Sequence, residues 1–208
     1  KCRTAVVDKK LPDPKTFSGS EDAWKGLCDM DLDLVYICTP WHWHTPMAIY
    51  SMKAGKHVAV EVPVTQSMDE CWELVETSEN TKKHCVILEN CCYDFFEMLT
   101  LNMARQGLFG EIVHTEGAYI HDLMDLNFSK TYYADLWRLK ENATRNGNLY
   151  PTHGLGPVAQ CLDINRGDRM EYLVSVSSGD FSMHDREVKE AGKDPMFQPF
   201  INENFRGN

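Results

Sequence analysis

A repeating alternation of apolar runs and amphipathic stretches dominates the first half of the chain. Short apolar runs at residues 34–39, 57–61 and 84–88 are each followed by a loop and then by a stretch with helical periodicity. Buried parallel strands have continuous apolar runs of this kind, whereas helices have apolar positions three and four residues apart. The pattern therefore predicts three strand–helix units, with helices over about 46–53, 67–82 and 93–105.

Local signals mark where these helices begin and end. Ser67 and Glu70 have the spacing of a capping box, and Gly55 and Gly107 follow the expected helix ends. Strands that alternate with helices over short links are typical of parallel sheets. We therefore predict an α/β fold that begins, over residues 1–108, with an incomplete doubly wound, Rossmann-type sheet whose strands are buried on both faces.

The pattern changes after Gly110. Residues 112–121 have the composition of a longer strand, and residues 172–177 alternate apolar and polar side chains, as half-exposed antiparallel strands do. Residues 122–140 suggest an irregular, aromatic-rich connection, and no convincing period follows Met183. This half predicts an α+β substrate domain over residues 109–208 with a mainly antiparallel sheet.

Charge and composition exclude several classes of partner. The net charge is −10 and there is no basic run, which argues against nucleic acid and anionic membranes. No apolar window approaches the roughly 18 residues of a membrane span. Eight cysteines in 208 residues are too few for a disulfide scaffold, and no C-x-x-C pair suggests zinc. We expect most of the cysteines to be free, with Cys38, Cys71, Cys91 and Cys92 as small buried apolar side chains.

Unusual side chains follow each of the three predicted strands. Because ligands bind beyond the carboxyl ends of parallel strands, these positions form a candidate site for a flat, polar ligand such as a nicotinamide riboside. The side chains concerned are Trp41, His42, Trp43, His44, Glu61, Glu89 and Asn90. Other interpretations stay open: the histidines lack a third metal ligand, the tryptophans suit a core, and the two glutamates could be an ordinary glycosidase pair or helix caps.

A second candidate lies at Tyr150-Pro151-Thr152-His153, where a phenol, a hydroxyl and an imidazole occur within four residues. Neighbouring glycines and prolines predict a fixed bend that enters a helix. A helix start whose His and Tyr are simply packed is an equally good interpretation of this stretch alone. Arg138 and Tyr119, taken singly, suit a solvated charge and a packing residue.

Five motifs together resemble one known family. The segments 39–44 (TPWHWH), 55–63 (GKHVAVEVP), 88–93 (LENCCY), 117–122 (GAYIHD) and 147–154 (GNLYPTHG) are similar to glycoside hydrolase family 109, the NAD-dependent α-N-acetylgalactosaminidases within the Gfo/Idh/MocA-type oxidoreductases. Val62 stands where dehydrogenases of the wider superfamily usually have Lys, which favours the narrower family. The family's glycine-rich phosphate loop, its ribose-binding acid and a later substrate Tyr are expected outside residues 1–208, so the chain is interpreted as an incomplete copy that lacks the first βαβ unit.

The resemblance implies NAD as cofactor and a small carbohydrate or glycoconjugate as substrate. No metal is expected, because no third ligand of metal spacing lies near His42 and His44. It places Trp41, His42, Trp43, His44, Glu61, Val62, Asn90 and Tyr150 at the cofactor, and Tyr119, Arg138, Tyr150, Pro151, Thr152 and His153 at the sugar. His153 is the expected base, Tyr150 its neighbour in proton transfer, and Arg138 a holder of sugar oxygens. An unperturbed imidazole titrates near pH 6.5, which suits a base at neutral pH.

The implied reaction oxidises C3 of the sugar, removes the C2 proton, expels the aglycone, adds water at C1 and returns the hydride. Two alternatives remain: a sugar dehydrogenase or oxidoreductase of the superfamily, and a non-catalytic carbohydrate-binding fragment. The resemblance also implies a periplasmic or secreted location and allows a homo-oligomer.

Overall fold

The chain divides after Ile87 into two compact units, residues 1–87 and 88–208. A computed structural model describes residues 6–145, 147–177 and 182–201. The division falls earlier than the predicted boundary after residue 108, because helix α5 (Phe95–Arg105) packs on helix α8 (Pro151–Cys161) of the second unit. Each unit is described below by itself.

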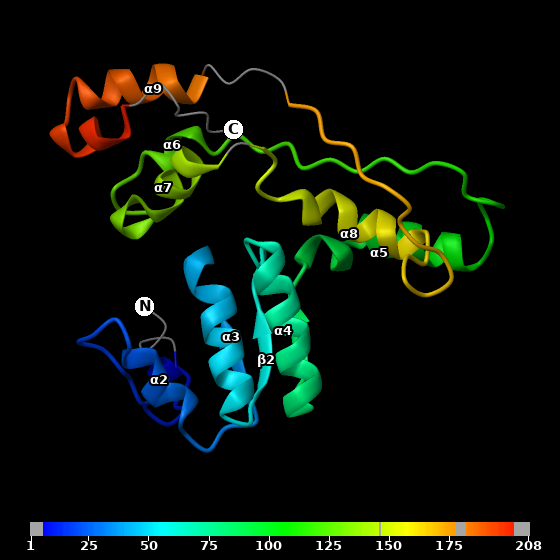
Figure 1. Ribbon diagram of the computed structural model, residues 1–208, viewed down its shortest axis with the longest axis horizontal. Helices are drawn as coiled ribbons and strands as arrows, with labels where there is room; N and C mark the ends of the chain where they lie inside the picture. The colour runs from blue at the N-terminus through cyan, green and yellow to red at the C-terminus, as the bar shows by residue number, and fades with distance from the viewer. Residues whose placement is uncertain (1–5, 146, 178–181, 202–208) are drawn as a thin grey trace. The chain divides into compact units, whose positions relative to one another are not determined.

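The first unit contains the predicted parallel sheet. Strands β1 (Leu34–Ile37), β2 (His57–Val60) and β3 (Cys85–Ile87) pair in the order β1-β2-β3. Helices α3 (His44–Lys53) and α4 (Met68–Thr81) form the two crossovers and lie side by side (Figure 1). Since both crossovers step in the same direction and such connections are right-handed, both helices cover the same face of the sheet.

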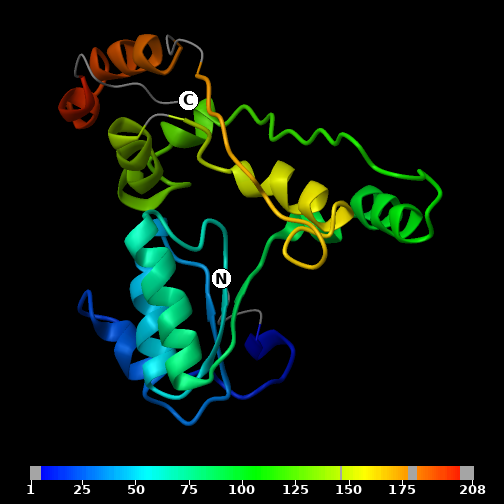
Figure 2. The ribbon, with the colours of Figure 1, turned by 45° about the vertical axis from the view of Figure 1, so that its right-hand side comes forward.

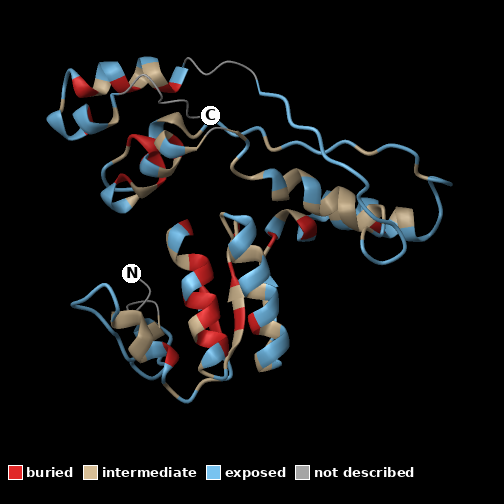
Figure 3. Cartoon of the chain, in the orientation of Figure 1, coloured by how far each residue is buried: buried red, intermediate tan, exposed pale blue. Residues whose placement is uncertain are grey.

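The core of this unit lies between that face and α3. Its buried members alternate along the strands and recur along the helix (Figure 3): Cys28, Val35, Ile37, Met47, Ala48, Met52, Val58 and Val60. On the other face, Leu34 is 54% exposed and Tyr36 56% exposed. The expectation of burial on both faces is therefore wrong for the described residues, because no described helix covers this second face. Helix α2 (Ala23–Cys28) packs against α3.

The predicted helix signals of the first unit are confirmed. Ser67 Oγ accepts a hydrogen bond from the Glu70 N–H at 3.2 Å, and the Glu70 carboxylate accepts one from the Gln66 N–H at 2.6 Å. Gly55, with a φ of +83°, follows α3 in the left-handed conformation that favours glycine. Helix α3 begins two residues before Pro46 because a 3-10 turn, η1 (Trp41–Trp43), leads directly into it.

The second unit is helical in its described residues. The 3-10 turn η2 (Asn90–Tyr93) packs with α5 and α8. Further along are α6 (Met124–Asn127), η3 (Ala134–Leu136), α7 (Trp137–Thr144), α9 (Ser182–Ala191) and η4 (Pro195–Phe200). The buried core of these elements comprises Phe128, Leu136, Leu139, Met183, Ala191 and Phe197.

Helix α9 corrects the expectation that the chain beyond Met183 lacks a period. Met183, Glu187 and Ala191 are buried and lie four residues apart, which is a helical spacing. The period is easily missed because one of its three members is charged. The end of this tail, residues 202–208, lies outside the described residues.

The predicted antiparallel sheet is wrong for the described residues. Residues 112–121 and 172–177 belong to no strand, and Figure 2 shows the first of these segments as plain coil between α5 and α6. Ile120 is 93% exposed and Val176 89% exposed. Alternation of apolar and polar side chains marks a strand only where a second strand supplies the ladder of hydrogen bonds, and neither segment has such a partner here.

The cysteines follow the prediction in one respect only. Those in the described part of the chain are free, but Cys38 is exposed, and Cys71 and Cys91 are only partly buried. Of the four expected to be buried, only Cys92 is. Among the described helices, none is long and apolar enough to cross a membrane.

Candidate active site

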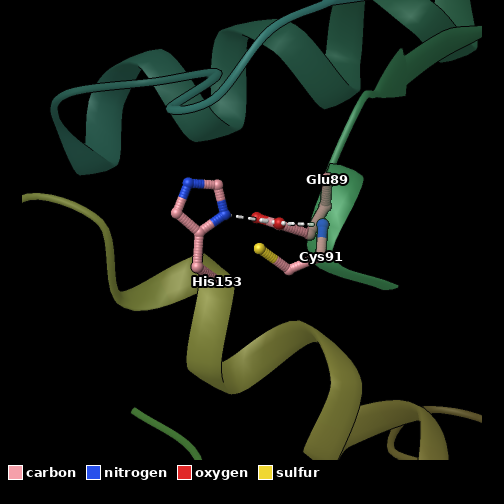
Figure 4. A group of neighbouring side chains, drawn as sticks. All are labelled: Glu89, Cys91 and His153. Atoms are coloured by element: carbon pink, nitrogen blue, oxygen red, sulfur yellow. Dashed lines mark hydrogen bonds and ion pairs between the residues drawn. The ribbon is translucent and has the colours of Figure 1, made fainter. Parts of the chain in front are cut away.

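The site is built on the first turn of α8. Tyr150 is the N-cap and Pro151 the first helical residue, as the bend in the sequence predicts. This start places the His153 side chain toward η2, where His153 Nδ1 lies 2.6 Å from Glu89 Oε1 (Figure 4). The side chains of His153 and Glu89 are 11% and 8% exposed, so the pair is largely shielded from water.

Glu89 is oriented by the backbone that follows it. As the N-cap of η2, it accepts a hydrogen bond from the Cys91 N–H at 3.1 Å through Oε1. Its other oxygen, Oε2, is buried and has no hydrogen-bond partner in the described part of the chain. A carboxylate that accepts the Nδ1 proton of an imidazole fixes the tautomer in which Nε2 carries a lone pair. This geometry therefore makes His153 Nε2 a proton acceptor.

Aromatic rings surround the imidazole. The Tyr150 ring stacks on His153 with centroids 5.1 Å apart and planes 2° apart, and the Tyr119 ring lies 4.9 Å from His153. Arg138 is 8% exposed and donates hydrogen bonds to the hydroxyls of Tyr150 at 3.3 Å and Tyr133 at 3.0 Å. Burial raises the pKa of Tyr133, although the Arg138 guanidinium acts in the opposite direction. The structure thus brings together Tyr119, Arg138, Tyr150 and His153, four residues predicted for the sugar site.

Two glycines of α8 allow its neighbours to approach closely. A Cβ atom on Gly154 would lie 2.9 Å from the backbone carbon of Gly117, and one on Gly156 would lie 2.8 Å from Cys92 Sγ and 3.0 Å from Glu89 Cγ. Such distances are too short for a side chain. The glycines therefore allow α8 to contact both the segment that carries Tyr119 and the turn that carries Glu89.

Two cavities adjoin these rings. One of about 520 Å³ has polar walls that include Tyr119, Arg138 and Tyr150, and one of about 680 Å³ has mostly apolar walls that include His153 and Pro157. Both volumes are in the range of small-ligand sites. Sugars are recognised by hydrogen bonds, so the smaller, polar cavity is the better candidate for the polar groups of a sugar. His153 lines the larger cavity and is in ring contact with Tyr119 and Tyr150 of the smaller one.

Sequence reasoning missed two residues of the polar cavity. Asn127 and Asn142 line it, are 3% and 1% exposed, and each has a buried Oδ1 without a hydrogen-bond partner. No motif or period marks either of them, and only their burial in the folded unit makes them notable. Of the remaining predicted sugar residues, Thr152 has a buried Oγ1 without a partner, whereas Pro151 is exposed.

The predicted cofactor residues of the first unit lie after β1 and β2. His42 is exposed and its ring contacts Trp43, whereas Trp41 is 3% exposed and Trp43 packs against Trp24. His44 is buried, with Nε2 2.7 Å from the Thr39 carbonyl oxygen and Nδ1 2.6 Å from that of Pro63. The ring therefore bridges the segments that follow β1 and β2, and both of its nitrogens contact backbone oxygens. Neither nitrogen can bind a ligand in this arrangement.

Glu61 and Val62 lie at the same edge. Glu61 accepts a hydrogen bond from the Tyr36 hydroxyl at 2.7 Å, and this bond raises the pKa of Tyr36. Val62 is buried. Asn90 belongs to the second unit, where it is exposed at the start of η2 beside Glu89.

Comparison with known proteins gives two family matches in chain order. Residues 15–89 match the model of the oxidoreductase family with an NAD-binding Rossmann fold, and residues 93–206 match that of the glycosyl hydrolase 109 C-terminal domain. The division between the matches lies close to that between the two compact units.

Individual relatives agree. An alpha-N-acetylgalactosaminidase of Bacteroides fragilis is 55% identical over 93% of this chain and 46% of its own length. A glycosyl hydrolase family 109 protein of the same species is 58% identical over 83% of this chain and 37% of its own, and one of Saccharopolyspora erythraea is 53% identical over 84% and 38%. The chain thus spans less than half the length of these relatives. Because the second family model covers more than half of the chain, the chain belongs to glycosyl hydrolase family 109.

Proposed function

We propose that the protein of which this chain is part hydrolyses terminal α-linked N-acetylgalactosamine from glycoconjugates in an NAD-dependent reaction, with His153 as the base. The proposal rests mainly on the hydrogen bond between His153 Nδ1 and Glu89. The imidazole stacks on Tyr150, which lines the polar cavity together with Arg138. The name of the Bacteroides fragilis relative supports the choice of substrate.

The strand ends of the first unit offer groups that fit a nicotinamide cofactor. His42 and Trp43 present flat rings and Glu61 a carboxylate at the edge where β1 and β2 end, and a parallel sheet binds nucleotides at this edge. Bound NAD would supply a temporary hydride acceptor for C3 of the sugar and would return the hydride at the end of each turnover.

Residues of this chain then catalyse the elimination of the aglycone. Nε2 of His153 takes the C2 proton of the 3-keto sugar, the C1–O bond breaks, and the aglycone leaves with the electron pair. Glu89 stabilises the imidazolium that forms, since a carboxylate beside Nδ1 offsets the new positive charge. Water adds to C1 and its proton neutralises the departed aglycone, while the imidazolium, after exchange of its proton with solvent, protonates C2.

Tyr150 and Arg138 position the sugar and assist proton transfer. Tyr150 and Arg138 both line the polar cavity, and Arg138 donates a hydrogen bond to the Tyr150 hydroxyl, so Arg138 can polarise this hydroxyl while other guanidinium protons bind sugar oxygens. Tyr119, in ring contact with both Tyr150 and His153, keeps the imidazole plane fixed.

Turnover of an α-N-acetylgalactosaminide by the full-length protein in deuterated water tests the proposal. We expect deuterium at C2 of the released sugar, and a C2-deuterated substrate in ordinary water should react more slowly, because the C2–H bond breaks. Full turnover with neither effect would overturn the elimination mechanism.

Matched histidine variants test the assignment of the base. His153→Ala should lower kcat by roughly 10²–10⁴-fold, the usual contribution of a positioned base. The control His84→Ala removes an exposed imidazole and should leave kcat unchanged.

The two alternative functions predict different results. A sugar dehydrogenase would accumulate reduced cofactor, seen as near-ultraviolet absorbance that grows with substrate. A binding fragment would bind sugar without turnover.

A further inference from the structure

The Glu89–His153 pair has a third neighbour that the proposed reaction does not use. The side chains of Glu89, Cys91 and His153 converge, and one ligand atom from each lies within 4.8 Å of the other two (Figure 4). A carboxylate oxygen, a thiol sulfur and an imidazole nitrogen are the three donor types that Zn²⁺ takes in proteins. The group therefore has the chemistry of a metal site.

A second observation points to a ligand here. Glu89 is 6% exposed, yet its Oε2 is buried without a hydrogen-bond partner. A buried carboxylate oxygen without a partner is costly in free energy, and an ion bound beside it would offset that cost.

The distances suit a small ion after minor rotation of the side chains. Zn²⁺ lies about 2.0–2.3 Å from its ligands, so tetrahedral ligand atoms are roughly 3.3–3.8 Å apart. Glu89 Oε1 and His153 Nδ1 are now closer than this, at 2.6 Å, because they form a hydrogen bond. The ligand atoms of the three side chains lie within 4.8 Å of one another, so the adjustment that the site needs is a rotation of the carboxylate that turns Oε2 toward the ion.

We propose that Glu89, Cys91 and His153 form a binding site for a borderline-soft divalent cation of the Zn²⁺ type, and that the bound ion reversibly blocks the base. The ion takes His153 Nδ1, so the neutral imidazole carries its proton at Nε2 and can no longer accept one. The Cys91 thiol proton goes to solvent as the metal–sulfur bond forms, and no electron transfer is involved. A water or hydroxide completes the fourth position.

Binding of Co²⁺ to the site can be measured by absorbance, without an assay of glycosidase activity. Cobalt bound to a thiolate absorbs in the near ultraviolet, so a difference spectrum of the full-length protein titrated with Co²⁺ should show this band. Cys91→Ser should abolish it, while Cys38→Ser, which removes an exposed thiol elsewhere, should retain it. No band in the unaltered protein, or an unchanged band in Cys91→Ser, would overturn the site.

The block of the base rests on the proposed function and has its own test. Zn²⁺ should inhibit turnover, a chelator should restore it, and Cys91→Ser should raise the half-inhibiting Zn²⁺ concentration by about tenfold or more, as loss of one ligand does. Serine keeps the backbone N–H that binds Glu89, and inhibition is measured relative to the metal-free activity of each variant. Equal Zn²⁺ inhibition in Cys91→Ser would overturn the inhibitory role. A protein without glycosidase activity that still shows the cobalt band would contradict the proposed function and leave the metal site supported.

Discussion

Glu187 is an acidic residue buried in α9. It is 0% exposed, and neither carboxyl oxygen has a hydrogen-bond partner among the described residues. Burial raises its pKa to about 7. The folded protein therefore keeps this carboxyl protonated over a pH range in which the unfolded chain has already ionised it.

Stability should consequently fall as pH rises from about 4.5 to 7, because the folded state then binds more protons than the unfolded state. Glutamine is neutral throughout, so Glu187→Gln should increase the free energy of unfolding at pH 8 by about 1–3 kcal/mol and change it little at pH 4.5. Urea unfolding at both pH values measures this difference. The exposed control Glu79→Gln should show none, and an equal effect of Glu187→Gln at both pH values would contradict the prediction.

At the same scale, the sequence predicted part of the candidate site. Tyr119, Arg138, Tyr150 and His153 were singled out by resemblance, and the structure brings them together. The roles of Asn127, Asn142 and Cys91 depend on which side chains come into contact after folding. One amino-acid sequence contains no local pattern that predicts these contacts. Whether the predicted cofactor residues bind NAD stays a prediction.

The first turn of α8 is the element on which the geometry of the site depends most. Alanine is favoured over glycine inside a helix by about 1 kcal/mol. At Gly154, however, the new Cβ would lie 2.9 Å from the backbone of Gly117, which cannot rotate away as a side chain could.

We therefore expect Gly154→Ala to destabilise the protein by about 1–3 kcal/mol despite its helix propensity. It should also lower kcat by about tenfold or more, because Tyr119 would shift relative to His153. Gly167→Ala is the matched control, since its Cβ would be 3.9 Å from Asp163 and should change stability by less than about 0.5 kcal/mol. Chemical denaturation and steady-state kinetics measure both effects, and a neutral Gly154→Ala would show that the two segments can separate freely.

Helices and strands were predictable from the sequence where the residues that determine them are neighbours in the chain. The strands at 34–37, 57–60 and 85–87 and the helices between them follow from apolar runs, a capping box and terminal glycines. The strands expected at 112–121 and 172–177 failed because a strand also needs a neighbour, and alternation does not say whether one is present. Helix α9 was missed because it buries a glutamate where an apolar residue was expected.

On the scale of the whole molecule, the buried apolar side chains lie in two separate clusters, while long extended segments contribute almost nothing to them. Val58 is 1% exposed in β2, whereas Val113 is 91% exposed in the segment once expected to be a strand. The same substitution at these two sites should therefore have very different effects.

Val58→Thr places a hydroxyl in the core and should cost about 1–3 kcal/mol, whereas Val113→Thr should change the free energy of unfolding by less than about 0.5 kcal/mol. Urea unfolding of residues 1–208 measures both variants. A comparable loss for Val113→Thr would mean that this segment is packed as a strand after all.

The close approach of Gly117 to Gly154 also bears on how the protein can be redesigned. A library that aims to change the preferred sugar should keep positions 117 and 154 as glycine, because a Cβ atom at either position would meet backbone atoms of the other segment. At position 156 a Cβ atom would displace the side chains of Cys92 and Glu89. Diversity is better placed at Asn127 and Asn142, which line the polar cavity and whose buried Oδ1 atoms have no hydrogen-bond partner among the described residues. The glycines thus define the part of the active site that a protein engineer should leave constant.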